Sequence, residues 1–135
     1  MTPGSTDPHL IERLSVFVLL PTYRASLDEV DALLDDHRDW LDGHCSAGRF
    51  LLVGRRVPRD GGFILAADGD RGDLERIAAT DPFSTAGLVT YEVLEVLPTG
   101  GAPAVLKTLA EHGVAASVPG RQRTTTQRGG PRCTS

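Results

Sequence analysis

Short apolar runs along the chain predict four β-strands, the first of them at residues 15–20. This run is rich in Val, Phe and Leu and is followed by Pro21, so we expect a buried strand that ends where proline removes a backbone donor. Residues 50–53 and 63–66 form two more apolar runs, and the Asp-Gly step between them is a strong hairpin signal. Residues 89–97 alternate between apolar and polar side chains, which predicts a fourth strand.

Helical periodicity predicts two helices, one on each side of the hairpin. Ser26 followed by Glu29 matches the S-x-x-E capping box, and apolar residues then recur at helical spacing, so we expect one long helix over residues 27–47. Residues 70–80 begin with acidic side chains and predict a second, shorter helix. The resulting β-α-β-β-α-β order is the ferredoxin-like pattern of an α+β fold with a four-stranded antiparallel sheet.

The predicted strands are too apolar for a sheet that turns one face to water. Both helices of this pattern cover the same face, yet the first three strands are almost continuously apolar. A second copy of the sheet is the simplest cover for the other face and predicts a homodimer closed sheet to sheet. The alternative is that the C-terminal segment folds back over it.

Composition separates a central domain from its flanking segments. All seven aromatic residues lie between residues 17 and 91, whereas Pro, Gly and Ser dominate the start of the chain and Arg dominates its end. We therefore expect four segments: a disordered leader at 1–14, the domain at 15–98, a linker with a short helix (103–112) at 99–119, and a disordered basic tail at 120–135.

Charge and hydropathy exclude several classes of protein. The net charge of −4 combines an acidic body with a tail that holds four arginines and no acid. An acidic body argues against nucleic-acid binding by the folded part. No apolar run approaches the roughly 20 residues that span a bilayer, and the first 15 residues do not resemble a secretory signal, so we expect a cytoplasmic protein without membrane association.

His37 and Asp81 are the first candidates for chemistry. His37 continues the apolar stripe of the first predicted helix and so faces inward. Asp81 follows the second helix, and because both helices lie on one face of the sheet the two side chains can meet. A carboxylate beside an imidazole fixes its tautomer and makes a general acid–base pair. The alternatives are a core histidine with one hydrogen bond, and an aspartate that caps a short helix starting at Pro82.

The residues around this pair resemble the YCII-related (YciI-like) family. The resemblance covers residues 15–98 and rests on the order and spacing of short elements. They are Asp-His-Arg at 36–38, Gly-Arg-Phe-Leu-Leu-Val-Gly at 48–54, Gly-Gly-Phe at 61–63, Asp-Pro-Phe at 81–83 and Ala-Gly-Leu at 86–88. Two positions depart from the family's pattern: Leu34 stands where an arginine is common, and Gly54-Arg55 stands where Gly-Pro is common.

The resemblance implies ferredoxin-like subunits that pair as a dimeric α/β barrel, with a pocket between helices and sheet. It implies His37 and Asp81 as the catalytic acid–base pair. Some related proteins are dehydrochlorinases, and muconolactone-isomerase-like chemistry is a neighbouring association. The implied function is isomerisation or elimination on a small cyclic acid, and the alternative is a non-catalytic ligand-binding or accessory dimer.

Three further residues are candidates for substrate binding. Trp40 lies one turn beyond His37 and belongs either to the core or to a pocket wall. Arg55 belongs to an arginine cluster on the hairpin, which is either a solvated turn or a clamp for a carboxylate. Ser84 either donates a hydrogen bond into the pocket or caps the turn that contains it.

No metal or cofactor is expected. His44 lies two helical turns beyond His37, roughly 10.5 Å along the axis, so one ion cannot readily bind both. Cys45 and Cys133 form neither a disulfide framework nor a metal-ligand spacing and are expected to be free thiols. The sequence has no glycine-rich phosphate loop, nucleophile elbow or zinc pattern.

Overall fold

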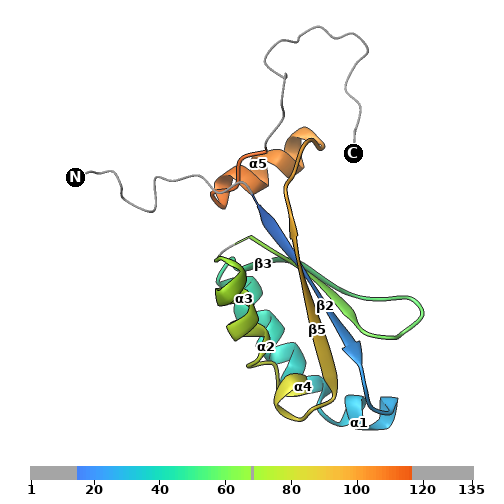
Figure 1. Cartoon of the computed structure of the whole chain (residues 1–135). Coiled ribbons are helices and arrows are strands. Elements are labelled where there is room, and N and C mark those ends of the chain that lie inside the picture. Colours follow the sequence, from blue (N-terminus) through green and yellow to red (C-terminus); the bar gives the residue numbers. More distant parts are fainter. Residues whose placement is uncertain (1–14, 68, 117–135) are drawn as a thin grey trace, which may run out of the picture. The chain divides into compact units, whose positions relative to one another are not determined.

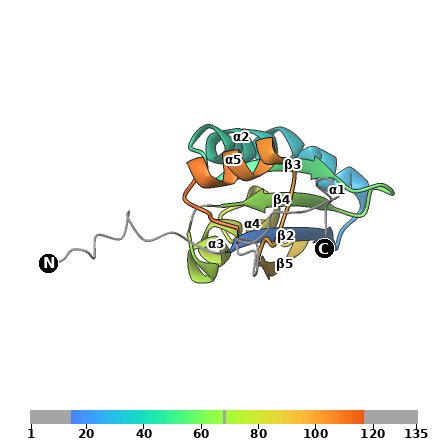
Figure 2. The same ribbon diagram turned by 90° about the horizontal axis from the view of Figure 1, so that it is seen from above.

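Four strands form one antiparallel sheet in the order β3-β4-β2-β5 (Figures 1 and 2). The computed structural model describes residues 15–67 and 69–116. The strands are β2 (Val16–Tyr23), β3 (Phe50–Arg55), β4 (Gly62–Ala66) and β5 (Val89–Val96). Helix α2 (Leu34–Ser46) precedes the β3-β4 hairpin and α3 (Arg71–Ala78) follows it. The expected ferredoxin-like α+β fold is therefore confirmed.

The chain divides into two compact units. The sheet unit, Phe17–Glu95, contains the sheet, α2, α3 and two short helices, α1 (Leu27–Ala32) and α4 (Pro82–Thr85). The C-terminal unit contains α5 (Pro103–Glu111), which agrees with the helix expected at 103–112. The predicted leader and basic tail lie outside the described residues.

The first strand does not end at Pro21, as we expected, but continues to Tyr23. Thr22 still pairs with Gly61, and the backbone N–H of Tyr23 donates to the carbonyl of Asp60 at 2.9 Å. Because backbone groups alternate in an antiparallel pair, the nitrogen of Pro21 faces the carbonyl of Gly62. Proline therefore removes one hydrogen bond from the β2-β4 pair without ending the strand.

Arg56 supplies the donor that Pro21 lacks. Its Nη1 donates to the carbonyl of Gly62 at 2.9 Å, and its Nη2 donates to Thr22 Oγ1 at 2.8 Å. The guanidinium fits only because residue 61 is glycine: a Cβ there would lie 2.7 Å from Arg56 Nη2 and 2.0 Å from the carbonyl oxygen of Pro21. One side chain thus completes the hydrogen bonding at this end of the sheet.

The single long helix expected over residues 27–47 is instead two helices that meet at Leu33. Leu33 has φ −111° and ψ 11°, outside the helical range. The break lets each helix bury a different side: Val30 of α1 packs with Phe83, whereas α2 packs Trp40 and other residues against the sheet. The expected Ser26 cap is present, since its hydroxyl accepts from the backbone N–H of Glu29 at 3.2 Å.

The main core lies between one face of the sheet and the helices α2 and α3. Alternate residues of the strands point into it, and α3 contributes Leu74 and Ala78. The capping box at the start of α3 is formed by Asp70 and Asp73, which accept from each other's backbone N–H groups. Both helices are therefore fixed on the same face, as the sequence pattern predicts.

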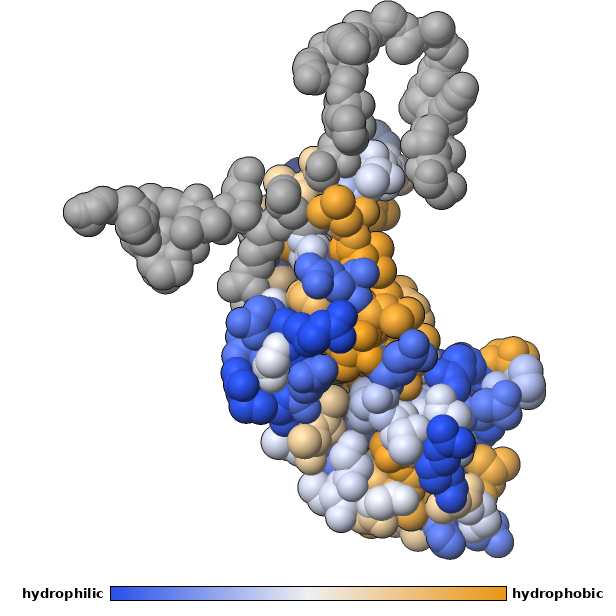
Figure 3. Space-filling model, viewed as in Figure 1, coloured by the Kyte–Doolittle hydropathy of each residue, from blue (hydrophilic) through white to orange (hydrophobic). Residues whose placement is uncertain are grey.

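The opposite face of the sheet is apolar as well. The strand register places Val18, Leu65 and Leu52 in one row across it. Leu52 is 58% exposed, and Leu94 of β5 is 38% exposed. Figure 3 shows apolar surface in the region of β5, beside the hydrophilic residues of α3. The expectation that the strands would be apolar on both faces is confirmed.

We expect Arg56→Ala to lower the free energy of unfolding by about 1.5–3 kcal/mol, because it leaves the Gly62 carbonyl without its charged donor. Urea denaturation monitored by circular dichroism measures this change. Arg55→Ala is the matched control, since Arg55 makes no side-chain hydrogen bond among the described residues. It should change the free energy of unfolding by no more than about 0.5 kcal/mol. Equal losses in the two variants would show that Arg56 does not have this special role.

Candidate functional site

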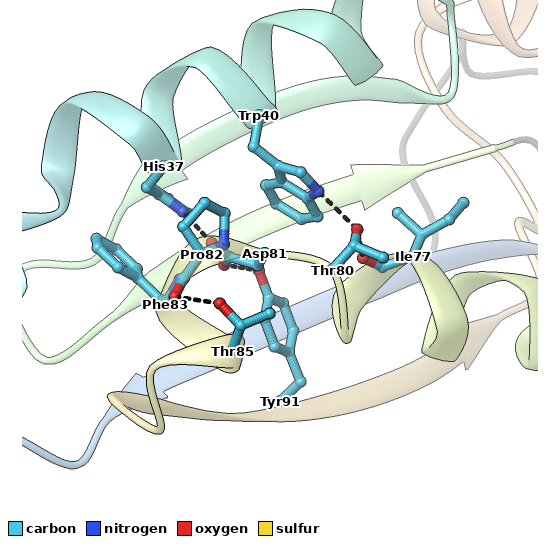
Figure 4. Close-up of polar contacts among 9 residues, drawn as sticks. All are labelled: His37, Trp40, Ile77, Thr80, Asp81, Pro82, Phe83, Thr85 and Tyr91. Atoms are coloured by element: carbon cyan, nitrogen blue, oxygen red, sulfur yellow. Dashed lines mark hydrogen bonds and ion pairs between the residues drawn. The ribbon is translucent and has the colours of Figure 1, made fainter.

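The buried side chain of Asp81 is the centre of the candidate site. Asp81 has no solvent exposure and lies at the N-terminus of α4, where its Oδ1 accepts from the backbone N–H of Phe83 at 2.9 Å. The same Oδ1 lies 2.8 Å from Nδ1 of His37, and Oδ2 accepts from the hydroxyl of Tyr91 at 2.7 Å (Figure 4). Three separate elements thus hold one carboxylate.

Asp81 makes both of the contacts that the two interpretations predicted, the helix cap and the pairing with His37. Pro82 is the first residue of α4 and Asp81 is its N-cap, as one alternative predicted. Asp81 also contacts His37, as the other predicted. A carboxylate has enough acceptor capacity for all three of its partners. The cap fixes the orientation of the carboxylate, and this orientation presents Oδ1 to the imidazole.

The hydrogen bonding around Asp81 determines which nitrogen of His37 carries a proton. Both other partners of the carboxylate, Phe83 and Tyr91, are donors to it. An ionised carboxylate only accepts, so Nδ1 of His37 carries the hydrogen in the neutral as well as the charged ring. Nε2 has no protein partner among the described residues. It is therefore the nitrogen that can gain or lose a proton.

Tyr91 is a hydroxyl donor to Asp81. Burial raises the pKa of Tyr91 far above its usual range, and the negative charge of Asp81 and the hydrogen bond to it raise the pKa further. Tyr91 points inward from β5 together with Val89 and Val93. Sequence reasoning assigned it only to the apolar face of a strand. A buried phenol needs a hydrogen-bond partner, and this was the available signal for its contact with Asp81.

Aromatic rings fix the plane of the His37 imidazole. It stacks on Phe83 with 4.0 Å between centroids and an angle of 11°, and Trp40 lies on another side at 5.9 Å. Trp40 is held in turn, because its Nε1 donates to Thr80 Oγ1 at 2.9 Å and that hydroxyl donates to the carbonyl of Ile77 (Figure 4). The imidazole has a side-chain exposure of only 13%.

A cleft of about 130 Å³ lies between α2 and the end of the sheet where the hairpin begins. His37 and Phe83 line it on the helix side, and Gly62 and Arg55 line it on the sheet side. Tyr23, at the end of β2, lines it as well. The cleft therefore combines an imidazole, two guanidinium groups (Arg38 and Arg55) and a phenol with walls that are otherwise mostly apolar.

The structure brings some of the candidate site residues together and separates others. His37 and Asp81 are hydrogen-bonded, and Arg55 lines the same cleft as His37. Trp40 packs beside His37 and does not line the cleft. Ser84 lines a different hollow, which it shares with Tyr91. Sequence reasoning did not name as candidates Tyr23 and Arg38, which also line the cleft; Tyr23 lies beyond the expected end of the first strand.

The other titratable candidates have local structural partners. Arg49 Nε donates to Nδ1 of His44 at 2.9 Å, and burial followed by the charge of Arg49 lowers the pKa of His44. Burial, together with the charge of Asp42, raises the pKa of the Cys45 thiol and makes it less reactive. Within residues 15–67 and 69–116, no cluster of His, Cys, Asp and Glu has the arrangement of a metal site. In that same part of the chain, no helix has the length and apolarity to cross a membrane.

Comparisons with known proteins agree with this fold. The chain superposes on the 5-chloro-2-hydroxyhydroquinone dehydrochlorinase of Burkholderia phenoliruptrix, solved in complex with 2,5-dihydroxybenzoquinone, with a TM-score of 0.55 and 17% sequence identity. The match covers 62% of this chain and 94% of the dehydrochlorinase. A comparison with curated protein sequences gives no significant match. The family model of the YCII-related domain matches residues 15–98. The chain therefore belongs to the YCII-related domain family.

Proposed function

We propose that this protein is a small-molecule enzyme in which His37 and Asp81 act as an acid–base pair, for isomerisation or elimination on a small cyclic acid. The observation that carries this proposal is the 2.8 Å hydrogen bond between His37 Nδ1 and Asp81 Oδ1, made at the wall of a cleft. A general base needs a basic atom that reaches the substrate and a partner that stabilises its charged form. His37 Nε2 and Asp81 meet these two requirements.

The size and charge of the cleft support a small anionic ligand. A cavity of about 150 Å³ is known to hold benzene, so a cleft of about 130 Å³ suits one substituted ring. Arg38 and Arg55 line the cleft, and no carboxylate is among the residues that line it. Arg55 is the group we propose for the carboxylate or enolate of the substrate, because a guanidinium binds such groups through two parallel hydrogen bonds.

The structural neighbour acts on a chlorinated hydroxyhydroquinone, and a quinone is bound in its structure. In an elimination of this kind, His37 Nε2 would take a proton from the ring system and a chloride ion would leave with the electron pair of its bond to carbon. In an isomerisation the same proton would return to a different atom. Both reactions need one group that takes up and returns a proton, and this group must be held in a fixed orientation. Asp81, Phe83 and Trp40 hold the His37 imidazole in this way.

The second candidate function is a ligand-binding or accessory domain without catalysis. The observation that favours it is the structural use of the same residues: Asp81 caps α4, and His37 fills a stack of rings. Such contacts would be retained in a protein that only binds its ligand.

We also propose that two copies of the sheet unit pair through their apolar faces. The row of Val18, Leu65 and Leu52 across β2, β4 and β3 supports this arrangement. A cytoplasmic location stays a prediction.

His37→Gln is expected to lower the turnover of chlorinated hydroxyhydroquinones at least about 100-fold, because proton transfer to a positioned side chain contributes 10²–10⁴. Glutamine retains an N–H for Asp81 and so preserves the buried contact. Released chloride measures turnover, and circular dichroism checks that the variant is folded. Unchanged turnover would contradict the acid–base role. Unaltered binding of 2,5-dihydroxybenzoquinone by a wild-type protein that shows no turnover would support the non-catalytic alternative.

Arg55→Gln is expected to weaken the binding of 2,5-dihydroxybenzoquinone about tenfold, since a charge-assisted hydrogen bond contributes about 1.4 kcal/mol or more. Isothermal titration calorimetry measures the dissociation constant. Lys107→Gln removes the same charge from α5, where Lys107 does not line the cleft, and serves as the control. Equal weakening in both variants would indicate an effect of net charge and not a contact with Arg55.

Leu52→Arg is expected to convert the protein from a dimer to a monomer of 14.4 kDa, because it places a charge on the apolar face, at the end of the row that β3 contributes. Light scattering at micromolar concentration measures the mass. Val57→Arg is the matched control: Val57 is 93% exposed and lies on the hairpin, outside the face. A monomeric wild-type protein would refute sheet-to-sheet pairing, as would dissociation in both variants alike.

A further inference from the structure

We propose that Tyr23 is a second catalytic residue, whose hydroxyl donates a hydrogen bond to the oxygen on which negative charge develops when His37 removes a proton. This inference rests on the proposed function and adds a second polar group that lines the same cleft as His37. It also restricts the ligand to a ring that carries a conjugated oxygen, such as a hydroxyquinone or an enolisable cyclic acid.

Tyr23 and His37 are held by the same ring. The face of Phe83 stacks on His37 at 4.0 Å, and Tyr23 meets Phe83 edge to face at 6.1 Å and 87°. Both residues line the cleft. His37 comes from α2 and Tyr23 from the end of β2, so the two groups approach the cleft from different layers of the fold. Phe83 fixes their separation.

Arg59 places a positive charge beside Tyr23. Its guanidinium carbon lies 5.9 Å from the centroid of the tyrosine ring. Asp31 holds Arg59 in place, with 2.5 Å between Oδ1 and Nη2.

The two phenols near the site have opposite electrostatic surroundings. Tyr91 donates to a buried carboxylate, and burial and this charge raise its pKa, so its hydrogen is committed to Asp81. Tyr23 has the guanidinium of Arg59 over its ring instead. A neighbouring positive charge strengthens a hydroxyl as a hydrogen-bond donor. Tyr23 is therefore suited to stabilise an anion, whereas Tyr91 positions Asp81.

The sheet leaves room for a flat ring between Arg55 and Tyr23. Arg55 pairs with Gly62 across the β3-β4 hairpin, and Gly62 has no side chain to fill the cleft. The ring can thus lie over bare backbone, with its oxygens near Arg55 and Tyr23.

The proposed reaction begins with proton abstraction and ends with loss of chloride or return of the proton. His37 Nε2 takes a proton from a ring carbon, the C–H bond breaks, and its electron pair moves through the conjugated system onto a carbonyl oxygen. Tyr23 donates a hydrogen bond to that oxyanion, and Arg55 supplies a positive charge. The carbonyl then re-forms as chloride leaves with its bonding pair, or as the proton returns from His37 to another carbon. No oxidant, reductant or further reactant is needed.

Tyr23→Phe tests the proposal because it removes only the hydroxyl and retains the ring contact with Phe83. Loss of one oxyanion donor is expected to lower kcat by about 10²–10³, with a much smaller change in KM. The second readout is the visible absorption band of bound 2,5-dihydroxybenzoquinone, which shifts with hydrogen bonds to its oxygens. The band is expected to differ between wild type and Tyr23→Phe, a change that a purely structural role of Tyr23 would not cause. Thr90→Val removes a hydroxyl that lies outside the cleft and is the control for both readouts.

A double-mutant cycle with Arg59→Gln tests the role of the cation. Arg59→Gln should shift the band of the bound quinone when Tyr23 is present and have no further effect in the Tyr23→Phe protein. Equal shifts in both backgrounds would contradict an action through Tyr23.

The failures of the two proposals are distinguishable. If His37→Gln abolishes turnover while Tyr23→Phe stays within about twofold of wild type with an unchanged band, the inference is wrong and the proposed function stands. If no substrate is turned over, a shifted band in Tyr23→Phe still supports contact of Tyr23 with the ligand, and an unshifted band refutes it. If the wild-type protein does not bind the quinone, the inference is refuted, whereas the acid–base role is judged from His37→Gln and chloride release.

Discussion

The burial of the Asp81 carboxylate is the constraint on which the rest of the sheet unit depends. A fully buried carboxylate is very unfavourable unless donors satisfy it, and its three donors come from α2, α4 and β5. These contacts fix how the helix that carries His37 lies relative to the last strand. The candidate catalytic pair therefore also connects α2, α4 and β5, and its geometry is determined before any ligand binds.

The polar groups around His37 and Asp81 fall into two sets. Tyr91, Thr80 and the backbone of Phe83 position other groups, because their hydrogen bonds are directed at protein atoms. His37 Nε2 and Arg55 have no such partner among the described residues and lie at the cleft. Asp81 is fully buried, so water competes little with the hydrogen bonds that Tyr91 and Phe83 donate to it, whereas Thr80 is exposed.

The sequence predicts the order of the elements because strands, helices and caps depend on neighbouring residues. Periodicity identifies the strands, and Asp81 before Pro82 identifies a helix start. The extension of β2 through Pro21 could not be foreseen, since the compensating donor is Arg56, which follows β3. The contact of Tyr91 with Asp81 and the place of Tyr23 in the cleft depend in the same way on tertiary packing, as periodicity predicts a face but not what lies opposite it.

The position of the cleft follows from the defect at Pro21. Proline removes a ladder hydrogen bond, and Gly62, opposite it, adds no side chain to the hollow that Pro21, Val53 and Arg55 line from the sheet. Successive residues of a strand point to opposite faces, so Arg55 and Arg56 separate. Arg56 bonds to the Gly62 carbonyl that Pro21 leaves unpaired, and Arg55 turns toward the cleft. Two adjacent arginines that look like one solvated cluster in the sequence thus have different roles: one completes the sheet, and the other gives the resulting hollow its positive charge.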